Sequence, residues 1–197
     1  MNRLWVTLLG CGALLAGLPA HADVTLVMFR HAEKPAAGLG QLSCQGLNRA
    51  LALPGVLLPN YGKPAALYAP NPGVVKDDEG TPYNYLRPLA TIEPTAIRVG
   101  LPVNTSLAWN DIAGLQDELL KPSHEGQTIF VAWEHHELEL LARALLKKRG
   151  GDPGVVGKWP GDDFDAIYVI TLHTHGGIQF KTASEGLDNR STTCPGA

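Results

Sequence analysis

The sequence predicts an α/β protein in which helices cover both faces of a mostly parallel sheet, giving a three-layer sandwich. Apolar strand-like runs alternate along the chain with amphipathic helix-like segments, and this alternation is typical of parallel sheets with crossover helices. Only residues 173–177 separate the last two predicted strands, which favours an antiparallel hairpin at one edge of the sheet. The part of the chain after residue 22 is long enough to bury a full core.

Each predicted element has a local reason in the sequence. Strands are expected at 24–29, 65–69, 103–105, 128–132, 166–172 and 178–182, which are apolar or alternate. Helices are expected from a Ser43 cap to about Leu53, and at 87–99, 111–120 and 137–149. Pro54-Gly55 should end the first helix, Pro88 suits the first turn of the second, and Pro94 should kink or split it. Residues 71–84 are rich in Pro, Gly and acidic residues and are expected to form a polar loop.

Residues 1–22 have the form of a secretory signal peptide. Arg3 gives a basic start, an apolar stretch runs from Leu4 to about Leu18, and Ala20-His21-Ala22 has the small-x-small form of a cleavage site. The tract Leu8-Leu9-Gly10-Cys11 also resembles a lipobox, and this is the alternative interpretation. Cleavage after Ala22 is favoured, so we expect 23–197 to form a single domain that is periplasmic or secreted.

Charge and cysteine content narrow the class of partner. Loss of residues 1–22 removes one basic residue and leaves 15 Lys and Arg against 19 Asp and Glu. Nucleic-acid-binding proteins usually carry a basic excess, so no nucleic acid partner is expected. No other segment approaches the roughly 20 apolar residues of a membrane helix, so no membrane span is expected. The remaining cysteines, Cys44 and Cys194, are expected to form a disulfide in an oxidising compartment, with two unpaired thiols as the alternative.

Three strand-to-helix junctions carry the residues that suit chemistry. Arg30-His31 follows the first strand, Glu134-His135-His136 follows strand 128–132, and Arg87 begins the helix that comes after strand 65–69. The carboxyl ends of parallel strands meet at one edge of a sheet, where open α/β sheets bind ligands. Two arginines and two histidines at that edge, together with helix N-termini, would form a site for a phosphate dianion.

The chain resembles the histidine phosphatase superfamily, which has the phosphoglycerate mutase-like fold. Three tracts carry the resemblance: Phe29-Arg30-His31-Ala32-Glu33-Lys34, Leu86-Arg87-Pro88-Leu89-Ala90-Thr91 and Trp133-Glu134-His135. The resemblance implies that His31 is the nucleophile and forms a phosphohistidine, and that Arg30 and Arg87 bind the phosphate. It also implies that His135 is the second histidine at the phosphate. His135 is preferred to His136 because it directly follows Trp-Glu after the strand.

The resemblance implies an acid phosphatase-type hydrolase that uses no metal and no other cofactor. Its substrates would be phosphorylated small molecules or phosphoproteins. Two guanidinium groups and an imidazolium can neutralise the charge of a phosphoryl group in flight. The attacking imidazole must be neutral, its other nitrogen should donate to a backbone carbonyl, and nearby arginines should lower its pKa. Glu137, Glu93 and Asp111 remain open as general acids.

Other interpretations compete with a metal-independent phosphatase. A non-catalytic protein that binds phosphate or a phosphorylated ligand would keep the arginines but lack a working acid. A metal-dependent hydrolase would need His135 or His136 together with His173 and His175. The acidic run 77–79 is expected to be a solvated loop, with a role in shaping substrate entry as the alternative. The basic helix residues are expected to be exposed, namely Arg49, Arg98, Lys147, Lys148 and Arg149. The sequence leaves the physiological substrate and the oligomeric state open.

Overall fold

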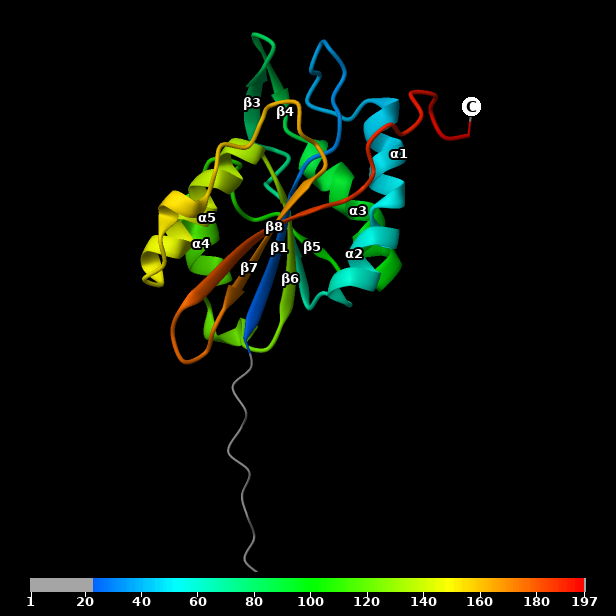
Figure 1. Ribbon diagram of the computed structural model, residues 1–197. Coiled ribbons are helices and arrows are strands. Elements are labelled where there is room, and N and C mark those ends of the chain that lie inside the picture. The colour runs from blue at the N-terminus through cyan, green and yellow to red at the C-terminus, as the bar shows by residue number, and fades with distance from the viewer. Residues whose placement is uncertain (1–22, 197) are drawn as a thin grey trace, which may run out of the picture.

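A six-stranded sheet forms the centre of the protein. The computed structural model describes residues 23–196, so the predicted signal peptide lies outside the described residues. The strand order is β5-β2-β6-β1-β7-β8 (Figure 1). The bounds are β1 Val24–Arg30, β2 Ala66–Tyr68, β5 Val103–Asn104, β6 Thr128–Trp133, β7 Ala166–Leu172 and β8 Ile178–Ser184. The four strands β5, β2, β6 and β1 are parallel, whereas β7 runs antiparallel to β1 and β8 runs antiparallel to β7. The mostly parallel sheet with an antiparallel edge hairpin is therefore confirmed.

Helices cover both faces of this sheet. One face carries α1 (Cys44–Ala52), α2 (Pro54–Tyr61) and α3 (Arg87–Val99), and the other carries α4 (Ile112–Leu119) and α5 (His135–Lys148) (Figure 1). Short 3-10 turns lie at Pro122–His124 and Pro153–Val155. No helix of residues 23–196 is long and apolar enough to cross a bilayer.

The central strand β1 is buried on both of its faces. Leu26 and Met28 pack in the core with α4 and α5, whereas Val27 and Phe29 pack in the core with α1, α2 and α3. All four side chains are fully buried. A strand with a helical layer on each side needs apolar residues at successive positions, which explains the unbroken apolar run in the sequence.

Two prolines affect the helices in different ways. The first helix, α1, ends at Ala52, as the Pro54-Gly55 stop predicts, and Pro54 then begins a separate helix, α2, where its missing N–H costs no hydrogen bond. Pro94 does not split α3, which continues from Arg87 to Val99. The neighbouring residues Ile92, Thr95 and Ala96 are buried against the sheet, and this packing holds the helix together across the proline.

The predicted polar loop 71–84 contains a β-hairpin, so that prediction was wrong. Strands β3 (Val75–Asp78) and β4 (Thr81–Asn84) pair antiparallel across a two-residue turn. Both turn residues, Glu79 and Gly80, have positive φ angles of 57° and 79°, as a type I′ turn requires. Glutamate is uncommon in that conformation, so the turn was difficult to predict from the sequence. The hairpin stands beyond the carboxyl ends of the parallel strands (Figure 1).

The C-terminal segment lies along α1. Cys44 and Cys194 form a disulfide, as expected. One helical turn further along α1, Asn48 Nδ2 donates hydrogen bonds to the carbonyl oxygens of Ser191 and Thr193 at 2.9 and 2.8 Å. The disulfide and these hydrogen bonds fasten the last residues of the chain to the first helix.

Arg49 is buried, contrary to the expectation of an exposed helix charge. Only 1% of its surface is accessible, and four carboxylates lie within 3.0 Å of its guanidinium nitrogens. They come from distant parts of the chain: Glu33, Asp165, Glu185 and Asp188. Arg49 therefore joins the segment after β1, the start of β7 and the C-terminal segment.

The substitution Arg49→Met should destabilise the protein by about 3–5 kcal/mol, because it leaves the fully buried Glu185 without its cation. Equilibrium unfolding in urea at pH 7 measures the loss. The matched control is Arg98→Met on exposed α3 surface, which should change stability by about 0.5 kcal/mol or less. If the two variants had the same urea midpoint and the same denaturant dependence, the Arg49 cluster would make no net contribution to the free energy of unfolding.

Candidate active site

A cavity of about 240 Å³ lies at the carboxyl ends of β1 and β6, beneath the β3–β4 hairpin. It brings together all four residues that the sequence singled out for phosphate chemistry. Its lining consists of Arg30, His31, Lys34, Lys76, Asp77, Asp78, Glu79, Arg87, Glu134 and His135.

His31 is held at the end of β1 with one ring nitrogen available. Its backbone N–H donates to the Trp133 carbonyl at 2.9 Å, and its Nδ1 lies 2.8 Å from the carbonyl oxygen of Ala32. Donation from Nδ1–H to this carbonyl leaves a lone pair on Nε2. Nε2 lies 3.4 Å from Arg87 Nε, a long and therefore weak hydrogen bond.

The electrostatic surroundings keep the His31 ring neutral. Burial lowers its pKa well below the ordinary value of 6.5, and the charges of Arg87 and Arg30 lower it further. This direction agrees with the expectation from the sequence, although burial rather than the arginines is the larger cause.

Arg30 is buried beside His31 and is fixed by the loop before β7. Its Nη1 donates to the carbonyl oxygens of Gly161 and Asp163 at 2.7 and 3.0 Å, and its guanidinium carbon lies 3.9 Å from the centroid of the Phe164 ring. Within the described residues, its buried Nε has no hydrogen-bond partner. Arg30 therefore keeps donor capacity that the protein itself does not use.

Arg87 stands at the first turn of α3, where Pro88 helps to begin the helix. Its guanidinium forms an ion pair with Asp78 of the hairpin and lies 4.9 Å from the centroid of the Tyr85 ring. Lys34 pairs with the other oxygen of Asp78 at 3.0 Å, and burial is outweighed by these cations, so the pKa of Asp78 is lowered. Asp78 is thus buried and ionised, which corrects the expectation that the whole acidic run 77–79 is solvated.

Thr91 connects the two halves of the site. Its hydroxyl accepts a hydrogen bond from the Ala32 N–H at 2.9 Å and donates to the Arg87 carbonyl at 2.8 Å. All three groups are buried. The threonine belongs to the second tract of the resemblance, but the sequence alone did not indicate this positioning role.

Of the two adjacent histidines, His135 lines the cavity, whereas His136 is exposed and does not. His135 is the first residue of α5, two positions before the expected start, because the Glu134 side chain caps the helix by accepting from the Glu137 N–H at 2.9 Å. The other Glu134 oxygen lies 2.6 Å from His135 Nδ1. Although burial opposes it, contact with His135 lowers the pKa of Glu134 to about 2.

None of the three carboxyl groups expected as general acids lines this cavity. Asp111 caps α4 by accepting from the Gly114 N–H, and Glu93 is exposed on α3. Glu137 is half-buried in the first turn of α5, where burial and the neighbouring Glu134 raise its pKa. Sequence reasoning missed Asp78 and treated Glu134 only as part of the histidine tract.

The histidines of the metal-dependent alternative lie at opposite ends of the sheet. Because β7 is antiparallel to β1, Leu172 pairs with Val24, and the turn that holds His173 and His175 lies at the amino end of β1. His173 Nδ1 contacts Asp23 there at 2.7 Å. Among residues 23–196, no group of three or more His, Cys, Asp or Glu side chains is placed to hold a metal ion.

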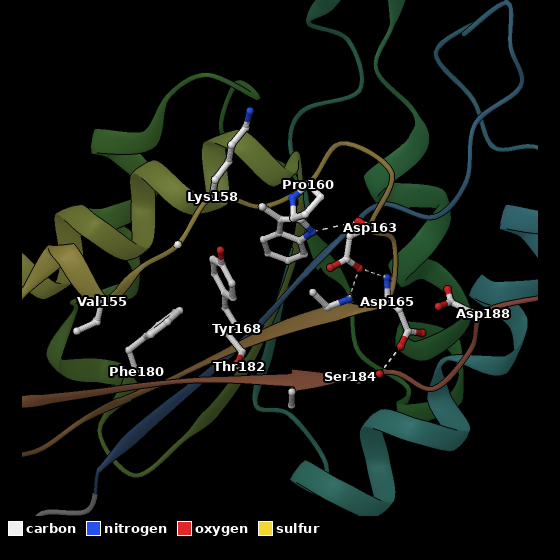
Figure 2. A pocket seen from close by; sticks show the side chains of 14 residues that line it. Val155, Lys158, Pro160, Asp163, Asp165, Tyr168, Phe180, Thr182, Ser184 and Asp188 are labelled. Atoms are coloured by element: carbon white, nitrogen blue, oxygen red, sulfur yellow. Dashed lines mark hydrogen bonds between the residues drawn. The ribbon is translucent and has the colours of Figure 1, made fainter.

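A second, larger cavity of about 570 Å³ lies between the loop before β7 and strand β8 (Figure 2). It contains none of the four predicted site residues. Tyr168 and Phe180 form part of its wall, and Asp163 belongs to the loop that holds Arg30. Asp163 therefore holds Arg30 of the first cavity through its carbonyl oxygen and also lines the second cavity.

Comparison with known proteins identifies the fold. No family model and no curated protein matches the chain. A protein described as the phosphohistidine phosphatase SixA of Nakamurella multipartitia superimposes with a TM-score of 0.55 at 15% identity, covering 82% of this chain and 96% of that one. Phosphoglycerate mutase of Plasmodium falciparum gives 0.56 at 12% identity, with 83% and 92% covered. A mycobacterial glucosyl-3-phosphoglycerate phosphatase in complex with inorganic phosphate gives 0.56 at 17% identity, with 82% and 98% covered.

These likenesses confirm the predicted fold class. The chain has the phosphoglycerate mutase-like fold. At such low sequence identity, these structural similarities establish the fold only. The function must be argued from the residues of the site.

The substitution Thr91→Val should destabilise the protein by about 1–3 kcal/mol, because valine keeps the shape but leaves the buried Ala32 N–H without an acceptor. Urea unfolding measures this change. Hydrogen exchange at the Ala32 amide should speed up in the variant. Thr95→Val is the control, since the buried Thr95 hydroxyl has no partner in the described residues and its loss should cost less.

Proposed function

We propose that the protein hydrolyses phosphomonoesters through a phosphohistidine intermediate on His31. The state of this imidazole carries the proposal: it is buried, its pKa is lowered, and its Nδ1 is tied to a backbone carbonyl. A neutral ring with a lone pair on Nε2, next to two guanidinium groups, suits attack on a phosphate dianion. The fold is shared with proteins whose names record phosphatase activity, which supports the same proposal.

In the first step, His31 Nε2 forms a bond to phosphorus while the bond from phosphorus to the alcohol oxygen breaks. The departing oxygen takes a proton from a general acid. In the second step, water attacks the phosphohistidine, the nitrogen–phosphorus bond breaks, and inorganic phosphate leaves. Arg30, Arg87 and His135 would bind the phosphoryl oxygens throughout.

The preorganisation of the cations supports this role for them. Arg30 is fixed by two carbonyls and Arg87 by Asp78, so neither guanidinium has to be immobilised when phosphate enters. His135 Nδ1 lies 2.6 Å from the Glu134 carboxylate, which leaves Nε2 as the nitrogen for a ligand. We further propose that the substrates are phosphorylated small molecules or phosphoproteins met in the periplasm or outside the cell, where the Cys44–Cys194 disulfide can form.

Purified protein should hydrolyse p-nitrophenyl phosphate in the presence of excess EDTA, and His31→Ala should reduce kcat by about 1,000-fold or more. His136→Ala is the control. His136 is exposed and lies next to His135, so this variant should retain activity. Mass spectrometry of quenched wild type should detect one added phosphoryl group on His31. Complete loss of turnover with EDTA would point to a metal enzyme. Binding of phosphate without any turnover would identify a non-catalytic phosphate-binding protein.

On the acidic side of the pH profile, kcat/KM should begin to fall only well below pH 6.5. His31 must be neutral to attack, and its lowered pKa keeps the neutral form populated as pH falls. Activity should therefore persist at about pH 5–6, where an imidazole in water is largely protonated. The measurement is kcat/KM as a function of pH, corrected for the protonation of the substrate's own phosphate group. A tenfold loss per pH unit that begins at pH 6.5 would contradict a depressed His31 pKa.

A further inference from the structure

Lys76 is a cation in the cavity that the reaction above does not use. It lies on β3 of the hairpin, is half-buried, and lines the same cavity as His31 and Arg87. Its Nζ lies 3.9 Å from the centroid of the Trp109 ring, close enough for a cation–π interaction.

Most other charged groups of the cavity have partners of opposite sign, whereas Arg30 donates to two backbone carbonyls and Asp77 accepts from the Gly80 N–H. Lys34 contacts Asp78 and Glu79 at 3.0 and 2.7 Å, Arg87 also contacts Asp78, and Glu134 contacts His135. Within residues 23–196, no carboxylate lies within 4.0 Å of Lys76 Nζ. Lys76 therefore has no ion pair in this part of the chain, its charge acting only at longer range to favour the ionised forms of Glu134 and Glu137, and its N–H donors can bind a ligand.

The position of Lys76 is fixed by the core. Trp133, fully buried at the end of β6, donates from Nε1 to the Trp109 carbonyl at 2.6 Å. Trp109 in turn donates from Nε1 to the Val75 carbonyl at 3.1 Å, directly before Lys76. Two indole hydrogen bonds thus connect the hairpin strand β3 to β6, which ends at Trp133.

Lys76 and the proposed nucleophile share one neighbour, the buried Tyr85 ring. The His31 ring and Lys76 Nζ each lie 5.9 Å from its centroid, and the Arg87 guanidinium lies 4.9 Å from it. His31 and Lys76 also line the same cavity, so one ligand can contact both. The cavity volume of about 240 Å³ also favours a small ligand.

We propose that Lys76 binds a second anionic group of the substrate, so that the preferred substrates are small phosphomonoesters with a carboxylate or a second phosphate a few bonds from the ester. This inference rests on the proposed phosphate site at Arg30, His31 and Arg87. Those two guanidinium groups suffice for one phosphate dianion, which leaves Lys76 for another anion. Trp109, stacked beneath the ammonium, keeps it directed into the cavity.

A matched pair of ligands tests the proposal: 3-phosphoglycerate and glycerol 3-phosphate, which differ by a carboxylate against a hydroxymethyl group. Wild type should prefer 3-phosphoglycerate in kcat/KM by about tenfold or more, which corresponds to about 1.4 kcal/mol. In Lys76→Gln this preference should fall to about one, and Lys76→Arg should restore part of it. Lys181→Gln, on the exposed surface of β8, is the control and should keep the wild-type preference.

Calorimetric titration of the same two ligands separates this proposal from the proposed function. If no phosphomonoester is hydrolysed but wild type binds 3-phosphoglycerate more tightly, and Lys76→Gln does not, the anion site stands and the phosphatase proposal fails. If p-nitrophenyl phosphate is hydrolysed and the preference is the same in wild type and Lys76→Gln, the anion site is overturned and the phosphatase proposal stands. Equal affinity of wild type for the two ligands, or none for either, also overturns the anion site.

Discussion

The parallel pairing of β1 with β6 is the constraint on which the site depends. Arg30 lies in register with Trp133, and the pairing continues one step further through the hydrogen bond from the His31 N–H to the Trp133 carbonyl. Because the two strands run in the same direction and end together, Arg30-His31 and Glu134-His135 must meet at one edge. A shift of this register by one residue would turn the alternating side chains of β1 toward the opposite layers of helices. Burial of β1 on both faces therefore fixes the position of His31 as well as the stability of the sheet.

The hairpin adds a second constraint through one carboxylate. Asp78 accepts from the Gly40 N–H, pairs with Lys34 and Arg87, and so joins β3, the segment after His31 and the start of α3. A Cβ at Gly38 would clash with the Asp78 carboxyl group, so that close approach requires glycine. The hairpin is in this way part of the site wall, and it brings Lys76 to the cavity.

The sequence was sufficient for the parts of the structure that depend on local pattern. The apolar runs located all six strands of the central sheet, and parallel order then brought Arg30, His31, Arg87 and His135 to one cavity. It failed where a residue's environment is made by distant segments. Arg49 has an ordinary amphipathic-helix context, yet Glu185, 136 residues away, covers it. Asp78 sits in an acidic, loop-like run, and its burial follows only from contact with Arg87 and the glycines after His31.

These distant contacts also explain how an acidic protein can hold an anion in a cavity lined by four basic and four acidic residues. The chain carries more acidic than basic residues, and several carboxylates lie close to His31 in the sequence or in space. Four of them have a cationic or histidine partner: Glu33 with Arg49, Asp78 with Arg87 and Lys34, Glu79 with Lys34, and Glu134 with His135. Glu33 is the clearest case, since it is only two residues from the proposed nucleophile and its carboxylate binds Arg49 of α1. The buried Arg49 cluster thus holds the C-terminal segment in place and keeps a negative charge from opposing an anion at His31.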